Sequence, residues 1–212
     1  MIGIGAGGHA RVVLETLQVM GVHEIIGLLD ARPELHGQRI LGVPVLGDDG
    51  LLGALRDEGV RHFFLGIGST KRTSLRRQVY ERLVREGFEA VDVIHPSAAV
   101  SASATLGRGS VILAGAVVGP GVVLEENVIV NSGAVVEHDC IVGGHVHIAS
   151  GAVLGGAVQV GTEAHIGSGA VVLQGLRIGS GATVGAGAAV ISDVSAGTTV
   201  VGVPARALRS HS

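Results

Sequence analysis

The sequence contains little of what builds an ordinary globular core. Among its 212 residues there is no Trp, and the aromatic residues together make up 2%. Aromatic side chains usually supply much of the buried area of a core, so we expect this chain to pack aliphatic side chains in a narrow interior. There is also a single Cys. One Cys cannot form an internal disulfide, which favours a reducing compartment, and we expect the protein in the cytoplasm.

Basic charge and long apolar runs are missing as well. A net charge of -3 gives no basic surface for nucleic acid. The first ten residues, MIGIGAGGHA, lack the charged segment and the apolar stretch of a signal peptide. No segment approaches the roughly 20 apolar residues of a membrane span. We therefore expect no nucleic-acid partner and no membrane insertion.

The feature that the sequence does have is a strict period of six. Every sixth position from 94 to 190 holds a branched aliphatic residue, seventeen in all: Ile94, Val100, Leu106, Ile112, Val118, Leu124, Val130, Val136, Val142, Ile148, Leu154, Val160, Ile166, Val172, Ile178, Val184 and Val190. Helices and ordinary strands have side-chain periods of about 3.6 and 2, so neither explains the pattern. A period of six is typical of a parallel β-helix, in which each hexad supplies one short strand and one turn.

Residues 1–93 follow a different pattern. Strands are expected at Ile2–Ile4, 24–30, 43–46 and 62–69, and helices at 10–20, 48–58 and 71–86. In the last helix we expect an inward face of Leu75, Val79 and Leu83 and an outward face of Arg76, Arg77, Arg82 and Arg85. Alternating strands and helices of this length predict a small Rossmann-like parallel sheet. We divide the chain into an α/β domain (1–93), a β-helix (94–200) and a C-terminal segment (201–212) that either caps the prism or leaves it as a tail.

The first strand leads into a glycine pattern, G-x-G-x-x-G, formed by Gly3, Gly5 and Gly8. Free backbone N–H groups at the start of the following helix can hold a phosphate. Asp30 ends the second strand at about the distance expected of a ribose-binding acid. His9 and the loop 66–70 also favour a ligand crevice at the strand ends. The alternative is a tight glycine-rich turn with no ligand.

Titratable residues in the repeat cluster between positions 131 and 147. His138 stands beside Asp139, and a carboxylate that fixes an imidazole makes a plausible general base. The alternative is a solvated turn. Cys140 occupies a position that other hexads fill with Ala, so we expect a small buried side chain rather than a nucleophile. His147 and His165 are eighteen residues apart and should stack on one face.

Six motifs follow one another along the chain: GAGGHA, LLD, GIGS, IHPSA, VVEHDC and VGVPAR. In this order they resemble the bacterial sugar acyltransferases of the PglD/NeuD type, over essentially the whole sequence. The resemblance implies a left-handed parallel β-helix with three hexads per coil, and a homotrimer with active sites between subunits. It also implies N-acetylation of a nucleotide-activated amino sugar by acetyl-CoA, without a metal, in bacterial surface-glycan biosynthesis.

The resemblance also assigns roles to individual residues. The catalytic base falls on His138 and its carboxylate on Asp139. Positions that contact acetyl-CoA fall on His147, Gly156, Ser168 and Ala186. Positions of the nucleotide-sugar site fall on Gly7, Gly8, His9, Asp30, Gly68 and Asn131. Some relatives carry a second acid where this chain has Ala31, which leaves the nucleotide open.

Three other functions are compatible with parts of the pattern. O-acetylation of sialic acid or a related sugar would use the same base. A γ-carbonic-anhydrase-like zinc enzyme would share the β-helix, although its His-x4-His pair is not matched here. A non-catalytic scaffold that binds a nucleotide sugar would need the α/β domain but not the His138–Asp139 pair.

Overall fold

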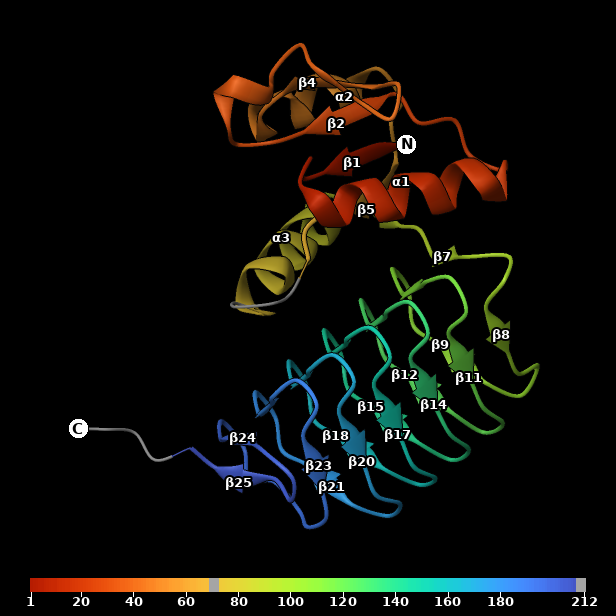
Figure 1. Ribbon diagram of the computed structural model, residues 1–212. Helices are drawn as coiled ribbons and strands as arrows, with labels where there is room; N and C mark the ends of the chain where they lie inside the picture. The colour runs from red at the N-terminus through yellow and green to blue at the C-terminus, as the bar shows by residue number, and fades with distance from the viewer. Residues whose placement is uncertain (69–72, 209–212) are drawn as a thin grey trace.

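The computed structural model describes residues 1–68 and 73–208. An α/β domain lies across the first coils of a parallel β-helix, which continues away from it to the C-terminal end (Figure 1). This arrangement confirms the two-part fold that the sequence predicts. No helix in the described ranges is long and apolar enough to cross a membrane.

The α/β domain is built on a six-stranded sheet in the order β3-β4-β2-β1-β5-β6. Its strands are β1 (Ile2–Ile4), β2 (Gly27–Leu29), β3 (Arg39–Ile40), β4 (Val43–Gly47), β5 (His62–Leu65) and β6 (Glu89–Ala90). Its helices are α1 (Gly8–Met20), α2 (Leu52–Asp57) and α3 (Thr73–Arg85), with 3-10 turns η1 (Pro33–Leu35) and η2 (Asp49–Leu51). The strands are parallel except for β3, which pairs antiparallel with β4.

Helix α1 ends where the sequence predicts, at Gly21, which adopts the left-handed conformation (φ 65°) and donates its N–H to the carbonyl of Leu17. The predicted strand 24–30 is shorter, and the predicted helix 48–58 begins as a 3-10 turn. The ends of two further predicted segments, at positions 69–72, lie outside the described residues.

The inward face predicted for α3 is wrong at Leu75 and Arg76 and confirmed at Leu83. Leu75 is 50% exposed, whereas Arg76 is 1% exposed. The buried positions are Arg76, Tyr80 and Leu83, spaced i, i+4 and i+7, so the first two lie one residue further along than expected and the third is as predicted. The rotation has a physical cause, because the Arg76 guanidinium donates to the carbonyl of Leu65 at the end of β5 and to that of Ile67 in the loop after it.

The β-helix is a three-sided prism. The first face holds β7 (Val93–Ile94), β10 (Val111–Ile112), β13 (Ile129–Val130), β16 (His147–Ile148), β19 (His165–Ile166), β22 (Thr183–Val184), β24 (Thr199–Val201) and β25 (Arg206–Ala207). The second face holds β8 (Ala99–Val100), β11 (Val117–Val118), β14 (Val135–Val136), β17 (Val153–Leu154), β20 (Val171–Val172) and β23 (Ala189–Val190). The third face holds β9 (Thr105–Leu106), β12 (Val123–Leu124), β15 (Ile141–Val142), β18 (Gln159–Val160) and β21 (Arg177–Ile178).

Residues eighteen apart pair between neighbouring coils, as in Val136 with Leu154. The repeated aliphatic residues point inward and form one continuous core from Ile112 to Val200, with the first coils packed against it. At the far end, β25 turns back antiparallel to β24 and covers part of the last coil.

Each turn between faces from Gly109 to Gly187 includes a residue in the left-handed conformation, which costs a residue other than Gly roughly 1–2 kcal/mol. On the edge between the first and second faces these residues are Gly115, Gly133, Gly151, Gly169 and Gly187. On the other two edges, five such positions carry side chains: Asn127, His145 and Glu163 on the third–first edge, and Asp139 and Ala157 on the second–third edge. Side chains at strained positions are a reason to look for a role there.

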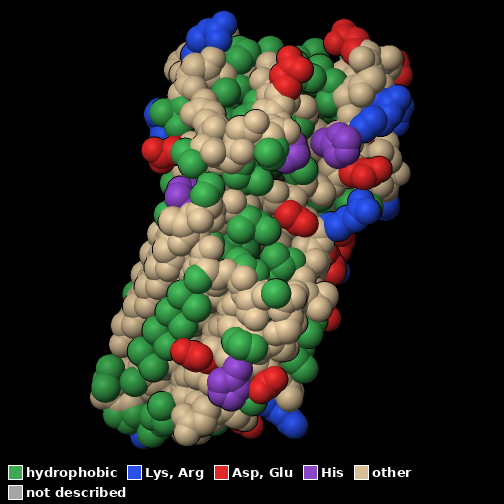
Figure 2. All heavy atoms as spheres, turned by 90° about the vertical axis from the view of Figure 1, so that its right-hand side faces the viewer, with side chains coloured by type: hydrophobic (Ala, Val, Ile, Leu, Met, Phe, Trp, Pro, Cys, Tyr) green, Lys and Arg blue, Asp and Glu red, His purple; other side chains and the backbone are tan. Residues whose placement is uncertain are grey.

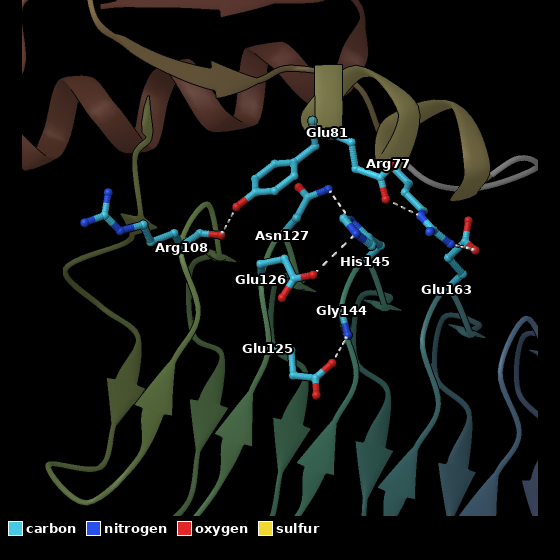
Figure 3. A network of polar contacts seen from close by, with 10 residues as sticks. Arg77, Glu81, Arg108, Glu125, Glu126, Asn127, Gly144, His145 and Glu163 are labelled. Atoms are coloured by element: carbon cyan, nitrogen blue, oxygen red, sulfur yellow. Dashed lines mark hydrogen bonds and ion pairs between the residues drawn. The ribbon is translucent and has the colours of Figure 1, made fainter. Parts of the chain in front are cut away.

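The third–first edge receives helix α3 of the α/β domain (Figure 3). The Arg77 guanidinium reaches Glu163 at 2.9 Å. The Tyr80 ring meets the edge of the His145 ring with centroids 5.5 Å apart. The Asn127 side-chain amide lies 2.9 Å from Nδ1 of His145. Helix α1 meanwhile shares a buried cluster with outward residues of β7, β10 and β13, so two helices hold the α/β domain on the prism.

Candidate active site

His138 and Asp139 form a hydrogen-bonded pair on the second–third edge. Nδ1 of His138 lies 2.8 Å from Oδ2 of Asp139, and both side chains are exposed. Asp139 has φ 59°, and its N–H donates to the carbonyl of Pro120 on the preceding coil. This backbone conformation helps to direct the carboxylate toward the ring. When Nδ1–H donates to Asp139, the lone pair of Nε2 is free to accept a proton.

Gly156 lies one coil beyond His138 and makes room for its ring. A Cβ on Gly156 would come 2.5 Å from Nε2 of His138. Gly121, one coil before Asp139, is equally close, since a Cβ there would come 2.7 Å from Oδ1. The His138–Asp139 pair therefore lies between glycines on both neighbouring coils.

Cys140 is not a candidate nucleophile. It is fully buried, and Sγ donates to the carbonyl of Gly155 at 3.2 Å. Burial raises the pKa of the Cys140 thiol. The prediction of a small buried side chain is confirmed.

A second group of polar residues lies on the first face, beneath the α/β domain. His147 pairs with His165 on the next coil, with ring centroids 5.0 Å apart, which confirms the predicted stacking. The Asn131 amide lies 3.2 Å from Nε2 of His147, and its Oδ1 accepts the N–H of Ser132 at 2.8 Å. His147 is only 3% exposed.

His9 reaches this group from the first turn of α1. Its pKa is lowered to about 3, chiefly by burial and then by the positive charges of Arg76 and His147. Gly68 lies against it, because a Cβ on Gly68 would come 3.4 Å from Cβ of His9. The structure thus brings His9, Gly68, Asn131 and His147 to one region. Positions 69 and 70 of the predicted crevice loop lie outside the described residues.

The glycine loop before α1 is tied to Asp30. Oδ2 of Asp30 accepts the N–H of Ala6 at 2.7 Å, and both carboxylate oxygens accept from the Arg32 guanidinium at 2.8 and 2.9 Å. Arg32 is the main reason that the pKa of Asp30 is lowered to about 2. Gly7 caps α1 without a side-chain hydrogen bond, and Gly8 begins the helix.

Sequence reasoning missed Arg32. Its guanidinium is half exposed, and a Cβ on Gly7 would come 3.8 Å from Nη2. The signal was present, because Arg32 follows the strand-ending carboxylate by two residues, within reach of a bidentate pair.

The residues assigned to acetyl-CoA fall on different parts of the prism. Gly156 lies on the second–third edge beside His138. Ser168 and Ala186 are exposed on the first–second edge, one coil apart. His147 lies on the first face. Within one chain, the second face separates the His138–Asp139 pair from Ser168, Ala186 and His147.

Within residues 1–68 and 73–208, no three His, Cys, Asp or Glu side chains gather as they would around a metal ion. The histidines on the first face line up along neighbouring strands instead.

Comparison with known families matches both halves of the chain. A model of the PglD N-terminal domain matches residues 2–83, and the bacterial transferase hexapeptide model, covering six repeats, matches residues 121–156. UDP-N-acetylbacillosamine N-acetyltransferase of Bacillus subtilis is 35% identical over 113 residues, which are 52% of this chain. That match spans 50% of the relative's own length.

Solved structures match over nearly the full length. A mutant of GDP-perosamine N-acetyl transferase from Caulobacter crescentus, in complex with CoA and GDP-perosamine, is 37% identical with a TM-score of 0.92, covering 99% of this chain and 96% of that one. The acetyltransferase domain of PglB from Neisseria gonorrhoeae, in complex with acetyl coenzyme A, is 40% identical with a TM-score of 0.89, covering 98% of each chain.

Proposed function

This chain belongs to the PglD-type sugar acyltransferases of the hexapeptide-repeat superfamily, and on that premise we propose that it transfers an acetyl group from acetyl-CoA to the amine of a nucleotide-linked amino sugar. The observation that carries this proposal is the His138–Asp139 pair, with Nδ1 and Oδ2 2.8 Å apart and Nε2 beside Gly156. Similar structures hold acetyl-CoA, or CoA together with a nucleotide amino sugar, which supports the choice of substrates.

In the proposed reaction the sugar amine attacks the thioester carbonyl carbon while Nε2 of His138 accepts a proton from the nitrogen. A C–N bond forms, the C–S bond breaks, and the proton passes from His138 to the departing sulfur. Asp139 accepts the Nδ1–H throughout, so it fixes the tautomer and stabilises the imidazolium that forms. A backbone N–H on the next coil, near Gly156, is the proposed donor to the oxyanion. No acyl-enzyme is required.

We propose that the active site forms between subunits of a homotrimer. Gly156 and Ser168 lie on different edges of one prism, so a coenzyme in contact with both positions is best accommodated between two chains. The face between these edges is apolar: its outward residues are Ala99, Val117, Val135, Val153, Val171 and Ala189. They contribute to the apolar surface of the prism in Figure 2. Burying such a surface against another subunit favours association.

The trimer can be tested by placing a charge on that face. Val135→Glu should give monomers in light scattering and abolish acetyl transfer, because an unpaired carboxylate would be buried at the interface. Thr105→Glu, at an exposed position on the third face, is the matched control and should leave the assembly intact. A trimeric Val135→Glu protein would show that another face is used.

The proposed acceptor is a UDP- or GDP-linked amino sugar, in keeping with the substrates for which two relatives are named. O-acetylation of sialic acid or a related sugar is the second candidate, since a His base also activates a hydroxyl. The proposed setting is bacterial surface-glycan biosynthesis in the cytoplasm.

A thiol-release assay decides between these functions. The purified protein is mixed with acetyl-CoA and a panel of UDP-, GDP- and dTDP-linked amino sugars, with sialic acid as the hydroxyl acceptor. We expect CoA release with an amino sugar, and a loss of about 10²–10⁴-fold in His138→Ala. Release with sialic acid alone would favour O-acetylation. Bound zinc without any release would favour a γ-carbonic-anhydrase-like enzyme, and nucleotide-sugar binding without release would favour a scaffold.

A further inference from the structure

Helix α3 buries a guanidinium where helix packing would place an apolar side chain. Arg76 is 1% exposed. Its Nη1 donates to the carbonyl of Leu65 at 3.2 Å and to the carbonyl of Ile67 at 2.6 Å. These carbonyls belong to the end of β5 and to the loop that follows. Arg76 therefore binds the backbone of the loop 66–68 from the buried side.

The charge of Arg76 has no counter-charge in residues 1–68 and 73–208. No carboxylate there forms an ion pair with it, and its Nε and Nη2 are buried without a hydrogen-bond partner. A buried, uncompensated cation is costly. It also lies in the first turn of a helix, which is the unfavourable end for a positive charge. Burial lowers the pKa of Arg76 to about 9, so the group stays protonated at neutral pH.

The loop that Arg76 holds lies against the start of α1, because a Cβ on Gly68 would come 3.4 Å from Cβ of His9. Arg76 is one of the charges that lower the pKa of His9, which stands in the first turn of that helix. The N-cap Gly7 supplies no side-chain acceptor, and the first turn of α1 contains no acidic residue. The nearby carboxylate of Asp30 is already paired with Arg32 through both oxygens. Two sources of positive potential, the helix terminus and Arg76, therefore meet where the loop 66–68 lies against the N-terminus of α1.

We propose that Arg76 is a positioning residue for the diphosphate of the nucleotide sugar, supplying its counter-charge from behind the loop 66–68. This inference rests on the proposed function and adds to it the residue that recognises the anionic part of the substrate. Phosphates bind at helix N-termini through free N–H groups. A buried charge strengthens that attraction because the low dielectric around it screens little. Arg76 acts through the loop and through its field, since its own nitrogen atoms are covered.

The test measures what the diphosphate contributes to binding, without acetyl-CoA and without turnover. Calorimetry gives Kd for GDP, guanosine, UDP and uridine. The measured quantity is the Kd of each nucleoside divided by the Kd of its diphosphate, a ratio that is large when the diphosphate strengthens binding. In Arg76→Met we expect this ratio to fall at least ten-fold, with nucleoside binding within about three-fold of wild type. Arg85→Met is the matched control: it removes the same charge from the exposed end of the same helix, nine residues away, and should leave the ratio within two-fold.

A ratio that changes by less than two-fold in Arg76→Met, or falls equally in Arg85→Met, would overturn the proposal. If Arg76→Met does not fold, Arg76→Lys decides. A buried lysine loses its proton at lower pH than arginine, so raising the pH from 7 to 8, still below the pKa of about 9 of Arg76, should reduce the ratio in Arg76→Lys and not in wild type. An unchanged ratio there would also overturn it. Wild-type protein that binds the diphosphates more tightly than the nucleosides but transfers no acetyl group would count against the proposed function instead.

Discussion

Gly156 stands one coil beyond His138, so close that a Cβ on Gly156 would come 2.5 Å from Nε2. The space beside this nitrogen therefore depends on a missing side chain. That space is where the proposed mechanism puts the reacting carbonyl, and its size sets the position of the ring.

Gly156→Ala should move the His138 ring and lower kcat by at least about 100-fold, since a displacement of about 1 Å at a reacting centre has that scale of effect. The thermal midpoint should stay within a few degrees, because the ring is on the surface and can turn away. Gly53→Ala is the control, at a helical position with nothing within 4 Å, and should leave kcat unchanged. Wild-type activity in Gly156→Ala would exclude Nε2 of His138 as the base.

Asp139→Asn keeps a side chain that tolerates the left-handed backbone but removes the negative charge. The imidazolium would lose its stabilising partner, and we expect kcat to fall about 10–1,000-fold with little change in KM. Glu137→Gln changes the charge equally at an exposed neighbouring position and should retain activity. Steady-state kinetics of both variants, with CoA release as the readout, make the comparison. If kcat falls equally in Asp139→Asn and Glu137→Gln, the cause would be the loss of negative charge near His138 rather than the loss of the hydrogen-bond partner at 2.8 Å.

His9 should make the fold sensitive to mild acid. Its folded pKa of about 3 lies below the ordinary value of 6.5, so between these values the unfolded chain binds a proton that the folded chain does not. Stability should therefore fall as the pH drops from 6.5, by about 2 kcal/mol at pH 5. Asp30 adds no change in this window, because its pKa is lowered from 3.8 to about 2 and its contribution is lost below pH 4.

Urea denaturation at pH 7.5 and pH 5 measures this effect at one protein concentration. His9→Gln should lose less stability between the two pH values than wild type does. His62→Gln, at an exposed position in β5, is the control and should behave as wild type. An unchanged pH dependence in His9→Gln would show that His9 is solvated in the folded protein.

The left-handed backbone at the turns of the prism predicts opposite changes in stability for two substitutions. Gly151→Ala puts a side chain at φ 68° with open space around it, so only backbone strain should be felt, about 1–2 kcal/mol of destabilisation. Glu163→Gly relieves the same strain at φ 61° and gives up a partly exposed ion pair with Arg77. Such a pair is worth about 0–1 kcal/mol, so that variant should be as stable as wild type or more so. Urea midpoints compare them, and a clear destabilisation by Glu163→Gly would mean that the contact with α3 outweighs the strain.

The six-residue period is sufficient by itself to place polar residues on the prism. It puts Val136 inside, His138 and Asp139 at the next turn, and His147 in line with His165, because the coils repeat without insertion. The period does not show what covers the first face. His147 is buried since the α/β domain lies over it, and no local pattern encodes that contact.

Helix α3 shows why the spacing of hydrophobic residues alone did not predict its buried face correctly. Leu75, Val79 and Leu83 fit an inward stripe, but Leu83 is shared with the true stripe of Arg76 and Tyr80. An arginine scores as a surface residue in such a pattern. The carbonyl groups at the end of β5 that bury it come from another element, which the sequence of the helix does not reveal.

The regular pairing of coils has a consequence for how the proposed site can change over time. Each coil bonds to the coils before and after it, with strands about 4.8 Å apart. Adding or deleting one unit of eighteen residues would leave every remaining side chain on its own edge and alter lengths along the axis by one such step. The length of the prism can therefore change only in steps of one coil. Gain or loss of whole coils would fit the proposed site to a longer or shorter acyl donor without changing the coil that carries His138 and Asp139.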